Sequence, residues 1–264
     1  MILRPRVDSR RHFVILFFAL VAMAWLALVA WGQSPYGRYL THQSLDDARD
    51  SLLLIPAFLA GWLLMIVAMM LPTSLPLVNL FRRLTGRRGN QALLLGLLLG
   101  GYTAAWLAFG VGVFGADWLL HEVVHRSAWV ESHSWMLGGS ALLVAGVYQF
   151  TPLKYMCLDK CRSPFGFINQ HWHGKRPRLE SLTLGLHHGA FCIGCCWSLM
   201  LLMFAVGVGN VGWMLVLGAV MAMEKNMLWG RRLSAPLGVV LVAAGLGIVL
   251  FAAPDVCARS LSGC

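Results

Sequence analysis

The sequence predicts an all-α fold, a polytopic membrane helix bundle with about seven transmembrane helices. Hydrophobic residues make up 58% of its 264 positions, and charged residues make up only 12%. Soluble domains carry about 25% charged residues, and one core could not bury so much apolar surface in a chain of this length. Lipid is therefore expected to cover much of the chain.

Seven apolar runs have about the length of 20 residues that a helix needs to cross the hydrocarbon. Backbone polar groups in lipid must be hydrogen-bonded within their own segment, so we expect each run to be helical. Residues 1–264 would then form a single integral membrane domain. The runs cover residues 13–31, 52–71, 91–115, 136–153, 187–206, 210–228 and 235–253.

The ends of the runs give further expectations. The first run has no small-residue cleavage site closely behind it, so we expect a span that stays in the protein. Gly96, Gly100 and Gly101 lie inside the third run, where small residues allow helices to pack closely. The fifth and sixth runs are separated only by the residues around Gly207 to Asn210, which predicts a tight hairpin.

The basic residues predict the orientation. Seventeen of the 21 Lys and Arg lie before the first run, after the second, after the fourth and between the last two. Because cytoplasmic loops are rich in Lys and Arg, the N-terminus is expected in the cytoplasm and the C-terminus outside. The net charge of +10 then reflects topology in a bacterial inner membrane. The partner of these short loops is the lipid bilayer, and no nucleic acid is expected.

Five of the seven cysteines fall into two motifs near the predicted cytoplasmic edge. One is Cys-x-x-x-Cys at the end of the fourth run, and the other is Cys-x-x-Cys-Cys in the fifth, one turn after two histidines. Spacings of three and four place side chains on one helix face, and an antiparallel pair of spans could bring both motifs together. The candidate metal ligands are Cys157, Cys161, Cys192, Cys195, Cys196, His187 and His188.

The chemistry of these residues favours a soft metal ion. Thiols stay reduced in the cytoplasm, so metal binding or redox work is expected there rather than disulfides. Thiolates and imidazoles suit Zn(II) or Cu(I), and a set richer in sulfur favours Cu(I). Buried cysteines also pack as small hydrophobes, but five at metal-ligand spacings favour a transition metal. We predict copper, Cu(I), with zinc as the alternative.

Methionines and one carboxylate could extend this site. Thioethers hold Cu(I) weakly and can pass it on, although Met also fills gaps in apolar cores. Glu224 and Lys225 lie near the cytoplasmic end of the sixth run. Glu224 could be a ligand, a proton acceptor or the structural partner of Lys225, Arg231 or Lys154. The candidates for a metal relay are Met65, Met69, Met70, Met200, Met203 and Glu224.

A second motif lies near the outer end of the third run. His121-Glu122-Val-Val-His125 fits His-Glu-x-x-His, in which two histidines bind zinc and the glutamate is a general base. A catalytic zinc needs a third protein ligand and an open position, and no recognised third ligand follows. Interfacial histidines without a metal are favoured here, and an outer metal site or a metallopeptidase with Glu122 as its base are the alternatives.

Four other residues leave questions open. Cys257 and Cys264 belong to the predicted outer tail, where an oxidising periplasm would permit a disulfide. His171 and His173 lie in the basic cytoplasmic loop. They could join a metal site, but a solvated loop is the default expectation for them.

The motifs together resemble the bacterial DUF2182 family of predicted metal-binding integral membrane proteins. The resemblance rests on Met-x-x-x-Met-Met-x-Pro (Met65 to Pro72), the segment from Tyr148 to Pro164, the segment from His188 to Trp197, and Glu224-Lys225. It implies a membrane metal site, in some descriptions for copper. The Glu and second His of residues 121–125 are not features of the family, which weakens the peptidase interpretation.

The sequence therefore predicts a protein that handles or delivers a soft metal, with a metallochaperone or another membrane protein as a candidate partner. A P-type ATPase phosphorylation motif and a nucleotide-binding loop are absent from the sequence, so ATP-driven pumping by this chain is not expected. Enzymatic activity is not favoured. The alternatives are a thiol oxidoreductase at the Cys motifs, a zinc metallopeptidase at residues 121–125 and a structural membrane subunit.

Overall fold

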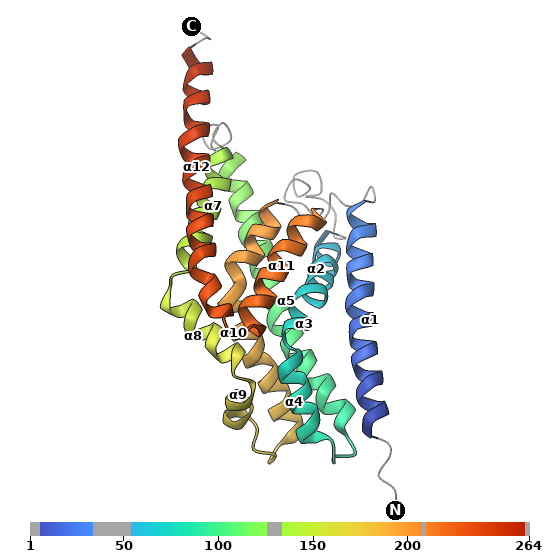
Figure 1. Cartoon of the computed structure of the whole chain (residues 1–264). Helices are drawn as coiled ribbons and strands as arrows, with labels where there is room; N and C mark the ends of the chain where they lie inside the picture. The colour runs from blue at the N-terminus through green and yellow to red at the C-terminus, as the bar shows by residue number, and fades with distance from the viewer. Residues whose placement is uncertain (1–5, 34–53, 126–133, 207–209, 262–264) are drawn as a thin grey trace, which may run out of the picture.

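The computed structural model describes residues 6–33, 54–125, 134–206 and 210–261, in which most residues are helical and no strand occurs. This confirms the all-α fold class (Figure 1). The elements are α1 (Arg6–Gly32), α2 (Leu54–Met65), the π-helix η3 (Ile66–Met70), α3 (Leu71–Thr73), α4 (Leu75–Thr85), α5 (Gln91–His125), α7 (Ser134–Tyr148), α8 (Pro152–Arg162), α9 (Pro164–His171), α10 (Pro177–Val206), α11 (Val211–Asn226), the 3-10 helix η4 (Gly230–Leu233) and α12 (Ser234–Leu261).

Several helices fit a membrane protein. Within the described residues, five are long and apolar enough to cross a bilayer, and a sixth crossing results if α7 and α8 form one bent span. The number of seven spans and the orientation of the termini remain predictions. The five segments are Arg11–Gly32, Ile55–Thr73, Gln91–Leu120, Pro177–Met203 and Gly230–Leu250.

The run expected over residues 136–153 is divided between two helices. α7 ends at Tyr148, and α8 begins at Pro152 with a bend of 64° between them. Pro152 has no N–H to continue the helix, and the Thr151 hydroxyl accepts a hydrogen bond from the Lys154 N–H at 3.3 Å. That contact caps the N-terminus of α8, so local sequence determines where the chain turns.

The run expected over residues 210–228 forms α11, which has 16 residues. The Asn210 side chain caps it by accepting a hydrogen bond from the Trp213 N–H at 3.1 Å. α11 is therefore shorter than the roughly 20 residues of a full crossing. The hairpin expected just before it falls largely on residues 207–209, which lie outside the described residues.

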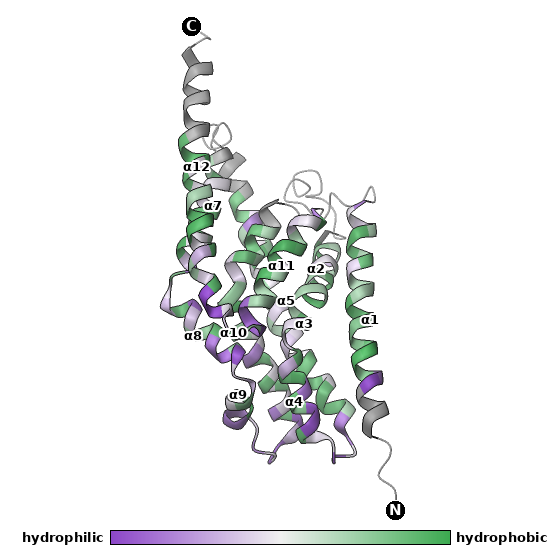
Figure 2. Ribbon diagram, in the orientation of Figure 1, coloured by the Kyte–Doolittle hydropathy of each residue, from purple (hydrophilic) through white to green (hydrophobic). Residues whose placement is uncertain are grey.

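The outside of the bundle is apolar. Figure 2 shows hydrophobic residues along α1, α7 and α12, whereas hydrophilic residues gather around α4, α8 and α9. Leu16, Leu26 and Leu250 are 70%, 68% and 65% exposed. So much exposed apolar surface is unusual for a soluble monomer and fits a surface that lipid covers.

The helices α5 and α10 cross at very short range because glycines face the opposite backbone. A Cβ atom at Gly101 would lie 2.3 Å from the Leu182 carbonyl oxygen, and one at Gly185 would lie 2.0 Å from the Leu98 carbonyl oxygen. Small residues allow such close crossings in membrane helices. The crossing holds Tyr102 of α5 beside the cysteines of α10.

Candidate metal centre

The two Cys motifs meet between α8 and α10. The Sγ atoms of Cys161 and Cys195 are 4.0 Å apart, and Gly194 allows Cys157 to come close. A Cβ at Gly194 would lie 2.5 Å from the Cys157 Sγ. All five of these cysteines are free thiols.

The three cysteines of α10 are almost completely buried. Cys192, Cys195 and Cys196 are each 1% exposed. The thiols of Cys195 and Cys196 donate to the Cys192 carbonyl oxygen at 3.1 and 2.8 Å. The spacing of three and four residues therefore places them on one face of α10, as helix geometry predicts.

A π-helical turn interrupts the second predicted span at its Met motif. In η3, the Leu71 N–H bonds to the Ile66 carbonyl, five residues earlier. Pro72 has no N–H, which would leave the Ala68 carbonyl without its usual helical donor. The Trp25 indole of α1 donates to that oxygen at 3.2 Å. Such π-turns occur often at functional sites.

The π-turn also directs Met70 toward the cysteines. The Met70 carbonyl accepts hydroxyl hydrogen bonds from Thr73 at 2.7 Å and from Tyr102 at 3.3 Å. The Met70 Sδ lies 3.7 Å from the Cys196 Sγ. We define the sulfur cluster by the five cysteines and this methionine: Cys157, Cys161, Cys192, Cys195, Cys196 and Met70.

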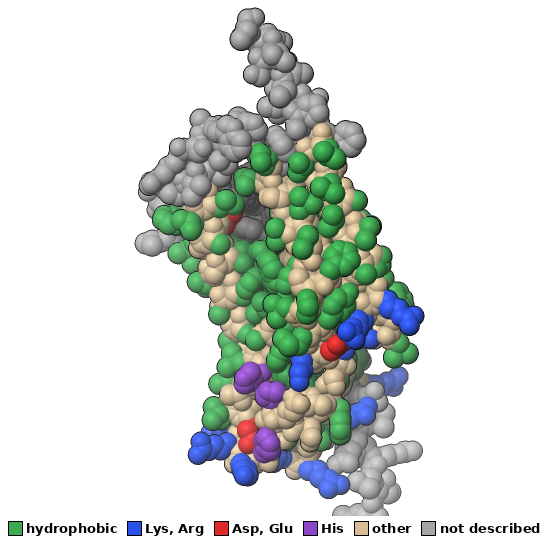
Figure 3. All heavy atoms as spheres, turned by 90° about the vertical axis from the view of Figure 1, so that its left-hand side faces the viewer, with side chains coloured by type: hydrophobic (Ala, Val, Ile, Leu, Met, Phe, Trp, Pro, Cys, Tyr) green, Lys and Arg blue, Asp and Glu red, His purple; other side chains and the backbone are tan. Residues whose placement is uncertain are grey.

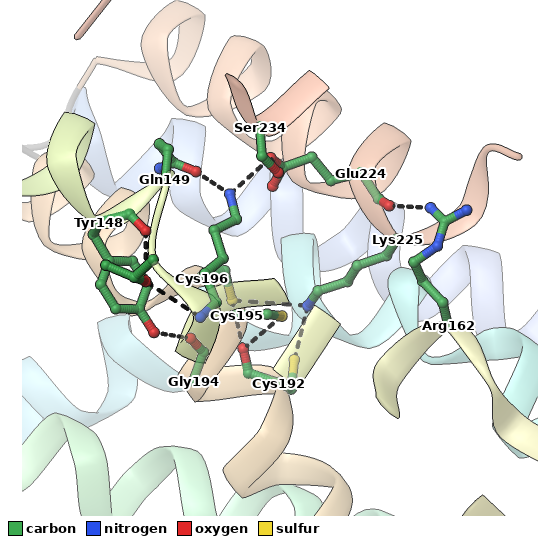
Figure 4. A network of polar contacts seen from close by, with 12 residues as sticks. Tyr148, Gln149, Arg162, Cys192, Gly194, Cys195, Cys196, Glu224, Lys225 and Ser234 are labelled. Atoms are coloured by element: carbon green, nitrogen blue, oxygen red, sulfur yellow. Dashed lines mark hydrogen bonds and ion pairs between the residues drawn. The ribbon is translucent and has the colours of Figure 1, made fainter. Parts of the chain in front are cut away.

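Lys225 of α11 reaches into the sulfur cluster. Its Nζ lies 2.8 Å from the Cys192 Sγ, 3.7 Å from the Cys196 Sγ and 3.8 Å from the Met70 Sδ. Figure 4 shows the lysine pointing toward Cys192 and Cys196. A further contact of 3.4 Å joins the Nζ to the Thr73 hydroxyl. The ammonium group therefore neighbours the atoms that a metal ion would use.

Tyr102 also contacts the sulfur cluster, although no motif in the sequence marks it. Its hydroxyl lies 3.1 Å from the Cys192 Sγ, and its side chain is only 2% exposed. The one signal in the sequence is a hydroxyl-bearing aromatic residue in the middle of an apolar run. That signal does not say which helix the hydroxyl faces.

Glu224 lies opposite Lys154, one of the pairings that the sequence left open. The Lys154 Nζ and the Glu224 Oε1 are 2.7 Å apart, with the side chains 0% and 2% exposed. The Ser234 hydroxyl donates to the same carboxylate oxygen at 2.7 Å, and Gln149 accepts from Lys154 (Figure 4). A role for Glu224 in a metal relay remains a prediction.

The two histidines of α10 point in different directions. His187 is exposed, and its ring centroid lies 4.9 Å from that of His171 of α9. His188 is 5% exposed, and its ring centroid lies 5.7 Å from that of Tyr102. Only His188 therefore shares the buried side of α10 with the cysteines.

The remaining candidate site residues form two groups, one buried in the core and one outside the described residues. The candidate relay methionines other than Met70 belong to the same apolar core as the cysteines. The side chains of His121, Glu122 and His125 lie outside the described residues, as do Cys257 and Cys264. The buried methionines are Met65, Met69, Met200 and Met203.

The donor set of the sulfur cluster fits a soft ion. Two sulfurs at about 2.3 Å from one tetrahedral ion lie about 3.8 Å apart. The Cys161–Cys195 and Cys196–Met70 separations, 4.0 and 3.7 Å, are close to that value. In the part of the chain that the structure describes, no group of three or more His, Cys, Asp or Glu is arranged to hold a metal. A third donor would have to move toward either sulfur pair.

Comparison with protein families gives one result. A family model described as PpoB2, copper chaperone, matches residues 59–248, more than half of the chain. This is the DUF2182 family, so the resemblance inferred from the motifs is confirmed. Comparisons with curated proteins and with solved structures give no match.

Proposed function

This chain belongs to the PpoB2 copper chaperone family, and we propose that it is a multi-pass membrane protein that binds Cu(I) as cargo in its sulfur cluster and hands it on. Family membership points to copper handling. The observation that supports the cluster as the site is the convergence of α8, α10 and η3, which brings thiols and a thioether together. Zinc is the alternative ion.

The chemistry and the positions of the proposed ligands both suit Cu(I). Thiolate and thioether sulfurs prefer Cu(I) to harder ions. Two sulfur pairs are the candidate donors: Cys161 of α8 with Cys195 of α10, and Met70 of η3 with Cys196 of α10. A bound ion would therefore join α8 and η3 to α10. The weaker thioether of Met70 would let the ion leave for a partner.

Lys225 and Tyr102 would act on the charge of this site. A Cu(I) ion held by two thiolates has a net negative charge, and a buried charge is costly unless it is compensated. The Lys225 ammonium lies 2.8 Å from the Cys192 sulfur and can supply that compensation. The Tyr102 hydroxyl lies 3.1 Å from the same sulfur, and its one proton, which is donated to the Met70 carbonyl here, could turn to a Cys192 thiolate.

The position in the cell follows from the charge pattern. We place the chain in a bacterial inner membrane with seven spans, a cytoplasmic N-terminus and the sulfur cluster at the cytoplasmic edge. A cytoplasmic metallochaperone or another membrane protein would exchange copper there. Reporter fusions after residues 88 and 175 should report a cytoplasmic location, and an outside location would refute this topology.

Burial of the three α10 thiols supports metal binding over the thiol oxidoreductase, although Cys161 of α8 is half-buried. Reactive redox cysteines are partly exposed so that a partner disulfide can reach them. Cys192, Cys195 and Cys196 are each only 1% exposed. A small ion can reach such sulfurs far more easily than a protein disulfide can.

The test is the copper content of the purified protein. The wild-type chain should bind Cu(I), and Cys192→Ser/Cys195→Ser should lose most of it. Cys257→Ser is the matched control, because it removes a cysteine outside both motifs and should leave the copper content unchanged. A wild-type chain that binds no copper, or a cluster variant that keeps all of it, would refute the proposal.

A further inference from the structure

The burial of the sulfur cluster raises the question of how copper reaches it. Three of its cysteines are 1% exposed and Met70 is 0% exposed, whereas Cys161 is half-buried. A hydrated ion needs donors near the surface that replace its water before it enters the apolar core. Imidazoles can do this for copper, and two of them lie together on the outside of α9 and α10.

His171 and His187 form a pair at the surface. Their ring centroids are 4.9 Å apart with an angle of 43° between the planes. His187 is exposed and His171 is half-buried. Figure 3 shows histidine side chains close together on this face, above a group of Lys and Arg. The pair is thus near the polar end of the bundle and open to an incoming ion.

His171 is held as a ligand would be. Its Nδ1 lies 2.9 Å from the Phe167 carbonyl oxygen, and a carbonyl can only accept, so Nδ1 donates. In the neutral ring this leaves the lone pair on Nε2. Histidines that bind metals almost always donate their other ring N–H in this way, which fixes the ring and raises its basicity.

His188 lies between the pair and the sulfur cluster. It is 5% exposed, and within the described chain its buried Nδ1 has no hydrogen-bond partner. The Phe167 ring contacts both His171 and His188, at centroid distances of 4.5 and 5.6 Å. His188 also precedes Cys192 by four residues, which places both on one face of α10. An unpartnered buried nitrogen is costly and is available to an ion.

We propose that His171 and His187 form a surface site that first binds Cu(I), and that His188 passes the ion inward to Cys192. This inference rests on the proposed function, since it supplies the sulfur cluster. No electron moves in the transfer. The ion exchanges imidazole nitrogen for cysteine sulfur, and the proton that each thiol loses passes to an imidazole nitrogen that the ion has left.

The test is the rate at which the full-length protein in detergent takes Cu(I) from a coloured Cu(I) chelator. His171→Ala and His187→Ala should each slow uptake by about tenfold or more, while the final copper content stays that of the wild type. His173→Ala is the matched control. His173 is exposed in the same loop, and its backbone N–H is bonded to Glu180 at 2.8 Å, so its replacement should leave the rate unchanged.

A second measurement separates this site from the sulfur cluster. With the chelator present, Cys192→Ser/Cys195→Ser/Cys196→Ser should hold almost no copper, whereas excess Cu(I) without chelator should give one weakly bound copper with nitrogen ligands, and adding His187→Ala should remove it. If His171→Ala and His187→Ala take up copper as fast as His173→Ala does, the surface site is refuted while the sulfur cluster stands. If the triple Ser variant keeps the full wild-type copper content with His187 as its ligand, the surface site stands and the sulfur cluster is refuted.

Discussion

Two buried lysines lie close to the sulfur cluster, and their surroundings differ. Lys154 of α8 is 0% exposed and pairs with the Glu224 carboxylate at 2.7 Å. Lys225 of α11 is 7% exposed, and its recorded partners are the sulfurs of Cys192, Cys196 and Met70 and the Thr73 hydroxyl. One lysine faces a fixed anion, and the other faces groups that can exchange a proton or a metal ion.

The different surroundings of the two lysines result from the directions in which two neighbouring side chains of α11 point. Glu224 and Lys225 are neighbours, so their side chains leave the helix about 100° apart. Glu224 turns toward Lys154 of α8 and Ser234 of α12, where the charges satisfy one another. Lys225 turns toward α10 and η3. The Lys154 pair therefore joins α8 to α11, whereas Lys225 faces the sulfur cluster.

The largest expected effect is on the Lys154 pair. Glu224→Gln leaves the buried ammonium without its anion, and breaking a buried ion pair costs about 3–5 kcal/mol. Thermal unfolding in detergent should show a large loss of stability. Asp159→Asn is the control, because it breaks an exposed pair with Arg231 at 3.5 Å, worth less than about 1 kcal/mol. Equal losses in the two variants would contradict a structural role for the Lys154 pair.

Lys225→Met should instead weaken copper binding. Hydrogen bonds to charged groups contribute about 1.5–3 kcal/mol, which corresponds to roughly a 10- to 150-fold weaker Cu(I) affinity. Competition with a Cu(I) chelator measures it. Lys160→Met, at a half-buried lysine bonded to Gln170 at 3.4 Å, should bind copper as the wild type does. An unchanged affinity in Lys225→Met would remove Lys225 from the metal centre.

Gly194→Ala should disturb the sulfur cluster by displacing Cys157. Its new Cβ would lie 2.5 Å from the Cys157 Sγ, and overpacking of this kind costs about 1–3 kcal/mol. We expect lower stability and less bound copper. Gly96→Ala adds the same methyl group inside α5 where no atom lies within 4 Å and should lower neither. Wild-type stability and copper binding in Gly194→Ala would contradict the tight packing of Cys157 against α10.

The smallest effect is expected from Met70→Leu. The volume is conserved, so stability should fall by less than about 1.5 kcal/mol, and loss of a weak thioether ligand should reduce Cu(I) affinity by less than about tenfold. Met214→Leu is the control, because it changes a methionine of α11 in the same core that is equally buried, at 0% exposure. A drop in affinity in both variants would mean that core packing, and not the thioether, sets the affinity.

The sequence predicted the fold class because long apolar runs are stable in lipid, where a helix hydrogen-bonds the backbone within its own segment. It did not predict the break between Tyr148 and Pro152, where a proline and the Thr151 cap turn a single expected span by 64°. It also gave no sign of the π-turn in η3. In that turn the Ala68 carbonyl accepts from the Trp25 indole of α1, 43 residues away in the chain, a contact that no local pattern contains.

The sequence predicted which cysteines form the candidate site, but it did not predict which other side chains contact them. Helical spacing correctly placed the α10 cysteines on one face, and the packing of α8 against α10 brings Cys161 to Cys195. The sequence favoured Glu224 over Lys225 as a residue of the metal site, yet the structure places Lys225 among the sulfurs. Which of two neighbouring side chains faces the cysteines depends on the rotation of α11 in the bundle, and packing sets that rotation.

The central claim is that copper binds among the buried sulfurs of α8, α10 and η3. X-ray absorption at the copper edge of the Cu(I)-loaded wild-type protein tests it most directly. We predict that sulfur makes up most of the ligand shell, and that Cys192→Ser/Cys195→Ser lowers the sulfur count. A shell made only of nitrogen and oxygen in the wild-type protein would contradict the claim.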